Sequence, residues 1–338
     1  MKTRAFSFKL PVELIAQEPP AQRGASRLLV LDRGTSALRH TRISELPSLL
    51  PPGTVMVLND SRVRKARLFG SSAQTGGAIE ALLLERLEGG RWRALTARSR
   101  SRRGRPYLFP GGVQGTVVES SGDSCVMEFE PPVDEDYLER HGHVPLPPYI
   151  RRQDTPADGS RYQTVYARHM GSAAAPTAGL HLSEELLAEL GLRGVQVLPV
   201  TLHVGLGTFL PIRSQSIEAH VMHTESYGVP LETAQAVNRA LAEGRKVLAV
   251  GTTAVRTLES AWREGELRPG EGQTALYILP GYRFRVVSQL LTNFHTPQST
   301  LLVMVSAFAG RLAILRAYRE AVRERYRFFS YGDAMLIL

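Results

Sequence analysis

The pattern of apolar residues changes twice along this chain, and these changes constrain the fold more than any other feature. Between about residues 64 and 130, short apolar runs alternate with glycine turns, as at 78–84, 92–97, 115–118 and 125–129. Short, evenly spaced strands of this kind predict a small barrel. After Tyr162 the predicted strands alternate with helices, which indicates an α/β domain. The sequence therefore predicts a barrel inserted into an α/β domain.

The predicted α/β domain is divided by this insertion. Buried strands are expected at 28–31 and 55–58 before it, and a proline-rich passage at 144–149 ends it. Ser183 is expected to cap the first helix that follows. The further elements expected after it are a strand at 195–203, a helix at 231–242, a strand at 246–251, a helix at 253–263 and strands at 276–279 and 286–291. We expect an α/β (α+β) main domain formed by 1–62 and 150–338, with a small antiparallel β-barrel formed by 63–149.

The bulk properties are those of a two-domain globular protein. The 338 residues allow a sizeable core, and 43% of them are hydrophobic. No apolar run is long enough to span a bilayer, and the first 17 residues lack the apolar centre of a signal peptide. Cys125 is the only cysteine, which excludes intramolecular disulfides and zinc fingers. We therefore expect a cytoplasmic protein with no membrane contact.

The charge balance points to an acidic partner. Lys and Arg number 41 against 32 Asp and Glu, a formal charge of +9, which favours nucleic acid but also fits a solubility bias. Two arginine groups could contact phosphates: one on a barrel loop, the other on an expected helix at 311–327. They are Arg100, Arg102 and Arg103, and Arg316, Arg319 and Arg323. The alternative is a solvated surface, with Arg316 paired to Glu320.

Two clusters of small and polar residues, 171–181 and 200–209, are separated by one predicted helix and one predicted strand. Small residues allow a backbone to approach a ligand closely, and each cluster has a histidine that can move protons near neutral pH. The clusters therefore predict two walls of one pocket. The alternative is a pair of tight turns whose histidines satisfy buried backbone groups.

Four further segments carry weaker signals. Gly205 and Gly207 follow a strand but lack the third glycine of a dinucleotide loop, because Leu210 holds that position. Residues 251–256 read as strand, turn and helix, so free N–H groups could bind an anion there, with Thr252 or Thr253 as the cap; plain helix capping explains the pattern equally well.

Polar residues also follow the strand expected at 286–291. Asn293 and His295 fall on one side of the chain and could line a ligand crevice, or form a turn with an asparagine cap. His220, His223 and Glu225 could be read as metal ligands, but no further ligand is nearby. Hydrogen bonding or acid–base work is favoured for them, and no metal is expected.

Taken together, these segments resemble the S-adenosylmethionine:tRNA ribosyltransferase-isomerase family of queuosine biosynthesis. The segments that match run nearly from end to end: 14–19, 26–29, 58–63, 145–150, 161–167, 171–181, 200–209, 251–253, 280–282, 292–295 and 326–333. Ala173 and Leu182 replace other apolar residues of the family. Leu210 and Gln298 stand where the family often has cations, which puts an anion-binding role at these two positions in doubt.

The resemblance implies both fold and reaction. An α/β domain with an inserted barrel would transfer and isomerise the ribosyl group of S-adenosylmethionine. The acceptor would be 7-aminomethyl-7-deazaguanine at the wobble position of tRNA. The products would be epoxyqueuosine-tRNA, adenine and methionine. The family needs no permanent cofactor and no metal; S-adenosylmethionine is a co-substrate, the tRNA anticodon stem-loop is the partner, and a monomer is expected.

The resemblance also suggests roles for particular residues. His181 and His203 are candidates for proton transfer, with Glu225, Asn293 and His295 orienting the substrate. The candidate substrate-binding residues are Asp60, Arg62, Thr177, Gly179, Gly205, Gly207, Thr208, Thr253, Arg256 and Asp333. Among them, Thr253 and Arg256 would hold the methionine carboxylate and Asp333 the substrate amine. Two other functions stay open: an S-adenosylmethionine-dependent RNA methyltransferase, and a non-catalytic tRNA-binding protein.

Overall fold

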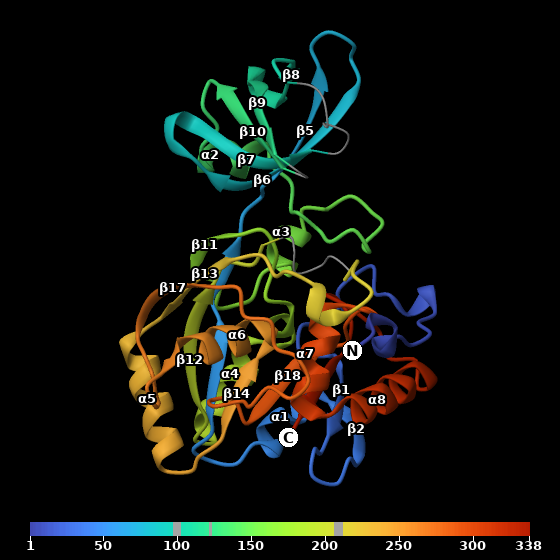
Figure 1. The fold of residues 1–338 in the computed structure, drawn as a ribbon, viewed down its shortest axis with the longest axis vertical. Coiled ribbons are helices and arrows are strands. Elements are labelled where there is room, and N and C mark those ends of the chain that lie inside the picture. Colours follow the sequence, from blue (N-terminus) through green and yellow to red (C-terminus); the bar gives the residue numbers. More distant parts are fainter. Residues whose placement is uncertain (97–102, 122–123, 206–211) are drawn as a thin grey trace.

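A large mixed sheet forms the centre of the α/β part of the molecule (Figure 1). The computed structural model describes residues 1–96, 103–121, 124–205 and 212–338. Within these ranges the sheet has nine strands. Their order is β17 (Gly270–Thr274), β13 (Glu225–Val229), β12 (Gln196–Leu202), β3 (Val55–Asn59), β14 (Val247–Val250), β18 (Gln289–Asn293), β19 (Ala334–Ile337), β1 (Arg27–Leu31) and β2 (Leu38–Arg42).

The four central strands, β12, β3, β14 and β18, run parallel to one another. Their carboxyl ends therefore meet at one edge of the sheet, where ligands bind in open α/β sheets. Antiparallel strands flank them, since β13 pairs with β12 on one side and β19 with β18 on the other. Two small sheets lie outside: β4 (Ser61–Val63) with β11 (His169–Ser172), and β15 (Trp262–Arg263) with β16 (Glu266–Leu267).

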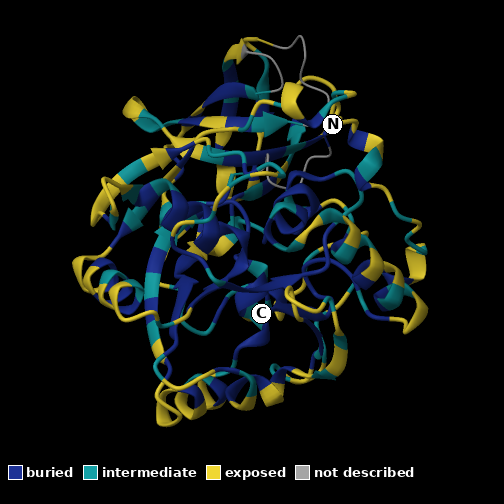
Figure 2. Cartoon of the chain, turned by 60° about the horizontal axis from the view of Figure 1, so that its bottom comes forward, coloured by how far each residue is buried: buried dark blue, intermediate teal, exposed yellow. Residues whose placement is uncertain are grey.

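Helices cover both faces of this sheet, and β3 shows how the sequence permits it. All five of its residues are buried, as is typical of a parallel strand covered on both sides. Val55 and Val57 belong to one apolar cluster, and Met56 and Leu58 to another on the opposite face. The first cluster packs under α5 (Leu231–Ala242), α6 (Gly251–Ala261), α7 (Thr300–Ala309) and α8 (Arg311–Arg323), the second under α1 (Leu46–Leu49) and α4 (Glu184–Leu192). In Figure 2 the buried strands lie inside a shell of partly exposed helices.

The barrel stands at one end of the molecule (Figure 1). Its antiparallel strands close in the order β10 (Ser124–Glu130), β7 (Arg91–Thr96), β6 (Ala78–Arg86), β5 (Arg67–Ser72), β8 (Pro106–Leu108) and β9 (Gln114–Ser121). Trp92 fills its interior and donates its indole N–H to the carbonyl of Val133 at 3.1 Å. Helix α2 (Glu135–His141) follows the barrel, and α3 (Asp158–Arg161) lies on the return path.

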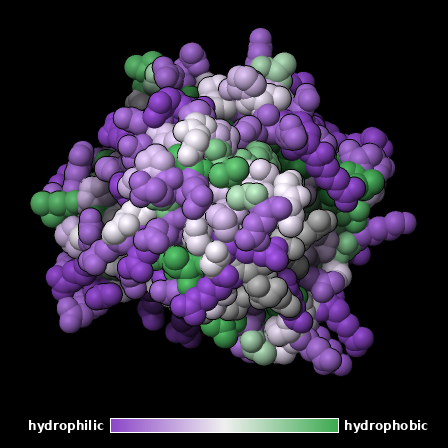
Figure 3. Space-filling model, turned by 90° about the horizontal axis from the view of Figure 1, so that it is seen from above, coloured by the Kyte–Doolittle hydropathy of each residue, from purple (hydrophilic) through white to green (hydrophobic). Residues whose placement is uncertain are grey.

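The surface of the barrel end is mostly hydrophilic. Viewed from that end, Figure 3 shows hydrophilic side chains over most of the face, with small hydrophobic islands between them. Phe69 and Leu108 are exposed hydrophobic residues of the barrel strands. Short 3-10 helices connect other elements: Thr3–Phe6, Val12–Leu14, Ile43–Glu45, Glu88–Gly90, Pro110–Gly112, Thr177–His181 (η6) and Ile217–Ala219.

The structure confirms the predicted fold class, a mixed α/β domain with a closed antiparallel barrel. The boundaries 1–62, 63–149 and 150–338 stay a prediction. No single helix in the described ranges is long and apolar enough to cross a membrane. Taken together, α7 and α8 have the length and the apolar composition of a membrane-spanning helix, but they meet at a bend of 115°.

Several local predictions were wrong. The strand expected at 276–279 does not form, because the N–H of Leu276 bonds to Thr274 Oγ1 and its carbonyl to Arg256 Nε instead of to a neighbouring strand. Helix α6 begins at Gly251, so Thr252 and Thr253 lie inside it and neither caps it. Strand β18 starts at Gln289 and α8 ends at Arg323, both inside their predicted ranges.

Candidate active site

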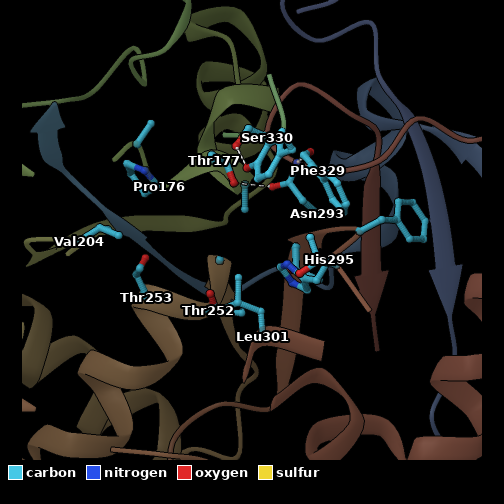
Figure 4. Close-up of a pocket in the computed structure, with 17 residues that line it drawn as sticks. Pro176, Thr177, Val204, Thr252, Thr253, Asn293, His295, Leu301, Phe329 and Ser330 are labelled. Carbon is cyan, nitrogen blue, oxygen red and sulfur yellow. Dashed lines mark hydrogen bonds between the residues drawn. The ribbon is translucent and has the colours of Figure 1, made fainter. Parts of the chain in front are cut away.

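A narrow pocket lies at the carboxyl ends of β14 and β18, and we call it the strand-end pocket (Figure 4). Its cavity volume is about 50 Å³. None of the described residues that line it is Asp, Glu, Lys or Arg. They are Tyr149, Ala175, Pro176, Thr177, Ala178, Val204, Gly251, Thr252, Thr253, Thr292, Asn293, Phe294, His295, Thr296, Leu301, Phe329 and Ser330. Both small-residue clusters of the sequence thus contribute to one pocket, although neither His181 nor His203 lines it.

Opposite walls of the strand-end pocket offer different chemistry. On one side the rings of Tyr149 and Phe329 lie 4.6 Å apart, and the hydroxyls of Tyr149 and Ser330 are hydrogen bonded at 2.6 Å. On the other side α6 begins without a side-chain cap, so its first N–H groups have no side-chain acceptor from the cap residue. An aromatic wall suits a flat ring, and a helix start suits an anion.

Behind the pocket, four buried or partly buried polar side chains form a chain of hydrogen bonds that we call the His181 relay: Ser26, His181, Asn293 and Thr177. Ser26 Oγ lies 2.8 Å from His181 Nδ1, and His181 Nε2 lies 3.1 Å from Asn293 Nδ2. Thr177 Oγ1 donates to Asn293 Oδ1 at 3.1 Å. The relay therefore connects a buried histidine to a hydroxyl that lines the pocket.

The relay fixes the tautomer of His181. Asn293 Nδ2 also donates to the carbonyl of Phe329 at 3.1 Å, so the atom facing His181 is an N–H donor. His181 Nε2 must then be the acceptor, and Nδ1 carries the hydrogen that is donated to Ser26. With both nitrogens bonded, the lone pair of His181 is already used, which is unsuited to a proton acceptor.

Both buried histidines of this region are neutral near pH 7. Burial lowers the pKa of His181 to about 4, with a smaller effect from the positive charge of Arg23. Burial also lowers the pKa of His295 to about 3. His295 Nε2 lies 2.8 Å from Thr292 Oγ1, and its backbone N–H donates to the hydroxyl of Tyr318 at 3.0 Å. Of the three predicted histidines, His295 is the one that lines the strand-end pocket.

His203 lies in a different and wider cavity of about 520 Å³, which we call the His203 cavity. The residues that line it are His169, Thr201, His203, Ser226, Tyr227, Gly228, Glu271, Gly272 and Gln273. His203 Nδ1 is buried without a hydrogen-bond partner among the described residues. Burial lowers the pKa of His203, and the charges of His169 and Arg64 lower it further, against an opposing effect of Asp60.

Asp60 holds one side of the His203 cavity in place. Its Oδ1 accepts from Thr201 Oγ1 at 2.7 Å, and its Oδ2 lies 3.5 Å from His169 Nε2. Arg62, two residues further along, is exposed on β4. Asp60 and His203 thus belong to the His203 cavity and do not line the strand-end pocket.

Asn59, which the sequence reasoning missed, separates the two cavities. Its amide nitrogen donates to the carbonyl of Leu202 at 2.9 Å and to Thr253 Oγ1 at 3.2 Å. Its Oδ1 accepts from the N–H groups of Ser61 at 3.1 Å and Leu202 at 3.0 Å. Because these bonds join β3, β12 and α6, Asn59 sets the spacing of the pocket walls. The sequence signal that could have identified Asn59 is its position at the end of a predicted buried strand.

Glu225 and Arg256 form a buried ion pair that connects α6 to the segment at Gly205. Their side chains are 5% and 3% exposed, and Glu225 Oε1 also accepts from the N–H of Gly205 at 2.7 Å. Arg256 donates further to the carbonyl of Leu276 at 3.1 Å. The described residues include no group of three or more His, Cys, Asp or Glu side chains placed to hold a metal ion.

Other predicted residues lie outside both cavities. The carboxylate of Asp333 accepts from the backbone N–H groups of Arg27 at 2.9 Å and Arg327 at 2.8 Å, and it lines neither cavity. Gly179 is buried, and a side chain there would collide with the hydroxyl of Tyr166. Gln298, one of the departures from the family pattern, donates to Ser7 Oγ at 2.8 Å.

The predicted phosphate-binding arginines are only partly described. Arg316, Arg319 and Arg323 are exposed along α8, and Arg103 is exposed on the barrel. The predicted pairing of Arg316 with Glu320 is wrong, because Glu320 binds Arg323 at 2.6 Å and lies 3.3 Å from His40. Outside the described residues lie Arg100, Arg102, Gly207, Thr208 and Leu210.

The aromatic wall was also missed as part of the site. Tyr149, Phe329 and Ser330 come from segments far apart in the chain, 145–150 and 326–333. Both segments are among those that carry the family resemblance. The residues themselves have no local pattern that separates a pocket aromatic from a core aromatic.

Comparison with known proteins identifies close relatives. The family model described as "Queuosine biosynthesis protein" matches residues 3–337. The S-adenosylmethionine:tRNA ribosyltransferase-isomerase of Syntrophotalea carbinolica is 53% identical over 345 residues, and that of Treponema denticola 48% over 348; each match covers both chains fully. The crystal structure of S-adenosylmethionine tRNA ribosyltransferase from Thermotoga maritima is 37% identical, with a TM-score of 0.58 over 99% of this chain and all of that one.

Proposed function

Because this chain belongs to the queuosine biosynthesis protein family, we propose that it is an S-adenosylmethionine:tRNA ribosyltransferase-isomerase. It transfers and isomerises the ribosyl group of S-adenosylmethionine onto 7-aminomethyl-7-deazaguanine at the tRNA wobble position. The products are epoxyqueuosine-tRNA, adenine and methionine. The observation that carries this function is identity of about half of all residues from end to end with enzymes of that name.

S-adenosylmethionine binds, in this proposal, at the strand-end pocket. The start of α6 beside Thr253 faces the methionine carboxylate, and the rings of Tyr149 and Phe329 face the adenine. Arg256 supports this helix through Glu225 and has no need to touch the ligand itself. Since the cavity volume is about 50 Å³, binding of the whole nucleoside must widen the pocket.

The electrostatics of the pocket suit a cationic ligand. S-adenosylmethionine carries a positive sulfonium, which would be repelled by a nearby cation. The described residues that line it include no Lys or Arg, and the low pKa of His295 keeps that ring neutral. His181 likewise stays neutral and orients Asn293, whose Oδ1 holds the hydroxyl of Thr177. We therefore assign His181 a positioning role, and Thr177, Asn293 and His295 a role in contacting the ligand.

The chemistry requires one proton acceptor outside this set. The sulfonium acidifies the protons on the ribose 5′ carbon; one is removed, adenine leaves as the sugar rearranges, the aminomethyl group attacks, an epoxide forms and methionine departs. None of these reaction steps is an oxidation or a reduction by an external redox partner. His203, whose Nδ1 has no partner among the described residues, is the candidate for proton transfer.

The remaining assignments follow from the family and from charge. We propose a cytoplasmic monomer that holds the anticodon stem-loop through Arg103, the α8 residues Arg316, Arg319 and Arg323, and Arg62 on β4. Arg100 and Arg102 belong to the same proposal by sequence. The enzyme works with S-adenosylmethionine as co-substrate and without a permanent cofactor or metal.

One assay tests the proposed function. The protein is incubated with S-adenosylmethionine and tRNA bearing the aminomethyl base, and the small molecules released are identified by mass spectrometry. Adenine and methionine in equal amounts are expected. Release of S-adenosylhomocysteine indicates a methyltransferase instead, and tRNA binding without consumption of S-adenosylmethionine indicates a binding protein.

A further inference from the structure

The His203 cavity has features that the strand-end pocket lacks. Its volume of about 520 Å³ lies within the range of small-molecule sites, whereas the strand-end pocket holds about 50 Å³. Four of its lining residues are exposed: His169, Ser226, Glu271 and Gln273. A base that remains attached to a polynucleotide can reach a wide site bordered by exposed side chains.

The cavity is built on one face of the antiparallel strands β13 and β17 at the edge of the large sheet. Gly228 on β13 lies opposite Thr201 on β12 and Glu271 on β17, and Ser226 lies opposite Gln273. Because side chains alternate along a strand, these residues share one face of the sheet. Tyr227 also borders the cavity, but its side chain and that of Val229 belong to the apolar core on the other face. The face of the sheet toward the cavity is therefore largely polar, and the opposite face packs in the core.

The polar groups of the cavity suit a cationic or N–H-rich ligand better than a phosphate. Glu271 lines the cavity, and the buried carboxylate of Asp60 lies behind His169 and Thr201. Two carboxylates disfavour an anion at this position and favour an amine or the N–H edge of a guanine-like base. The buried Nδ1 of His203, which has no hydrogen-bond partner in the part of the chain that the structure describes, adds a further polar group.

Exposed cations lie beside the cavity. Arg62 on β4 and Arg168, next to β11, are exposed, and β4 pairs with β11 through Arg62 and Met170. In Figure 1, β11 lies with β13 and β17 at the edge of the α/β domain nearest the barrel. A strand of RNA that crosses this edge can place its phosphates against arginines while one base enters the cavity.

The two cavities are close enough to serve one reaction. Successive residues of one segment border them, since His203 lines the His203 cavity and Val204 the strand-end pocket. Asn59 and Asp60 are likewise consecutive: Asn59 bonds to Thr253 in the strand-end pocket, and Asp60 to Thr201 in the His203 cavity. A thin wall at the ends of β3 and β12 therefore separates them.

We propose that the His203 cavity receives the acceptor base: a guanine-like base with a primary aminomethyl arm, flipped out of the RNA loop. Glu271 binds the amine or the N–H edge of the base, and His203 lies on the side nearest the ribosyl donor. This assignment rests on the proposed function and deepens it, because it separates a donor site from an acceptor site. It also transfers to Glu271 the amine contact that the sequence assigned to Asp333, whose carboxylate is held by two backbone N–H groups.

Gly228 offers a direct way to fill the cavity. A Cβ added there meets no atom within 4 Å, and the residue lies on a strand, where valine is well tolerated. Gly228→Val should therefore fold normally while occupying the space of the base. Glu271→Gln tests the carboxylate separately, and Glu232→Gln, an exposed residue of the first turn of α5, is its matched control.

The experiment compares two anticodon stem-loop RNAs, one with the aminomethyl base and one with guanine at the same position. Adenine release, RNA affinity and S-adenosylmethionine affinity are measured for each variant, with thermal unfolding to verify folding. We expect Gly228→Val and Glu271→Gln to lower kcat/KM for the modified RNA at least about tenfold and to abolish its preference over the guanine RNA. Binding of S-adenosylmethionine should change by less than about twofold, and Glu232→Gln should resemble the wild type.

Two results would overturn the assignment. If folded Gly228→Val keeps wild-type turnover and RNA preference, the base binds elsewhere. If instead Gly228→Val loses affinity for S-adenosylmethionine, the wider cavity holds the donor. The wild type is measured in the same assay, so that the acceptor site and the proposed function can fail separately. Absence of adenine release by the wild type contradicts the function itself.

Discussion

The two histidines that the sequence placed in one pocket occupy opposite kinds of environment. His181 is 3% exposed and bonded through both ring nitrogens, to Ser26 and to Asn293. His203 is partly exposed in a wide cavity, and its Nδ1 has no partner among the described residues. A fully bonded imidazole holds its neighbours in one geometry, whereas an incompletely bonded one is available to a substrate. Identical residue types in similar sequence clusters thus serve different purposes.

The largest effect should come from the relay itself. Asn293→Asp replaces the N–H donor that faces the carbonyl of Phe329 and His181 Nε2 with an oxygen, so two hydrogen bonds are lost. We expect kcat/KM for adenine release to fall on the order of 100-fold, about 3 kcal/mol of transition-state stabilisation. Asn238→Asp, whose amide bonds to the backbone of Leu267 far from the pocket, is the control. Activity within about threefold of the wild type would remove the relay from the mechanism.

The pH dependence of stability should also differ between the two histidines. The pKa of His181 falls from 6.5 to about 4 on folding, so between these values the unfolded chain binds the extra proton. The free energy of unfolding should therefore fall as pH drops through this interval, by up to ~1.4 kcal/mol per pH unit for this ring. His181→Asn should make the dependence shallower in urea titrations at pH 7, 6 and 5. His203→Asn should change it less, because His203 is partly exposed; equal changes in both variants would contradict the contrast.

A smaller effect is expected from Ser26. Ser26→Ala removes the acceptor of the His181 Nδ1 hydrogen and leaves a buried N–H without its partner. We expect a loss of about 1 kcal/mol in the free energy of unfolding and a several-fold loss of kcat with little change in RNA affinity. Ser48→Ala, on an exposed serine that bonds to its own turn, is the comparison variant. Unchanged kcat in a folded Ser26→Ala protein would show that the tautomer need not be fixed.

The smallest effect concerns the surface beside the His203 cavity. Arg62→Ala and Arg168→Ala each remove one exposed cation. We expect each to reduce the slope of log affinity against log salt for the stem-loop by about 0.7 to 1, uniformly for modified and unmodified RNA. Arg263→Ala, an exposed residue on β15, is the control. A change in preference between the two RNAs would instead indicate that these arginines touch the base.

The sequence predicted the fold better than the site, for a physical reason. Periodicity reports which face of an element is buried, so strands such as β3 and helices such as α5 could be predicted nearly to the residue. Side-chain direction at strand ends has no such period, and so the partners of His181 and His203 could not be predicted. Asn59 and Tyr149 were missed because their roles depend on contacts with segments more than 100 residues away.

Predictions from local propensity were also wrong where side chains take the hydrogen bonds that a neighbouring strand or a helix cap would otherwise make. The run at 276–279 is apolar enough for a strand, but Arg256 and Thr274 take up the hydrogen bonds of Leu276. Threonine is a common helix cap, yet Thr253 lies within α6 and accepts from Asn59. Both errors involve contacts of α6, whose start lines the strand-end pocket, and there local preference gives way to the geometry of the site.

A crystal structure with S-adenosylmethionine bound tests the central claim most directly, namely that donor and acceptor occupy separate cavities. We expect density for the adenosyl group between Tyr149, Asn293 and the start of α6, with the carboxylate at the N–H groups near Thr253 and the His203 cavity free of the ligand. Density for S-adenosylmethionine among His203, Ser226 and Glu271 would contradict it.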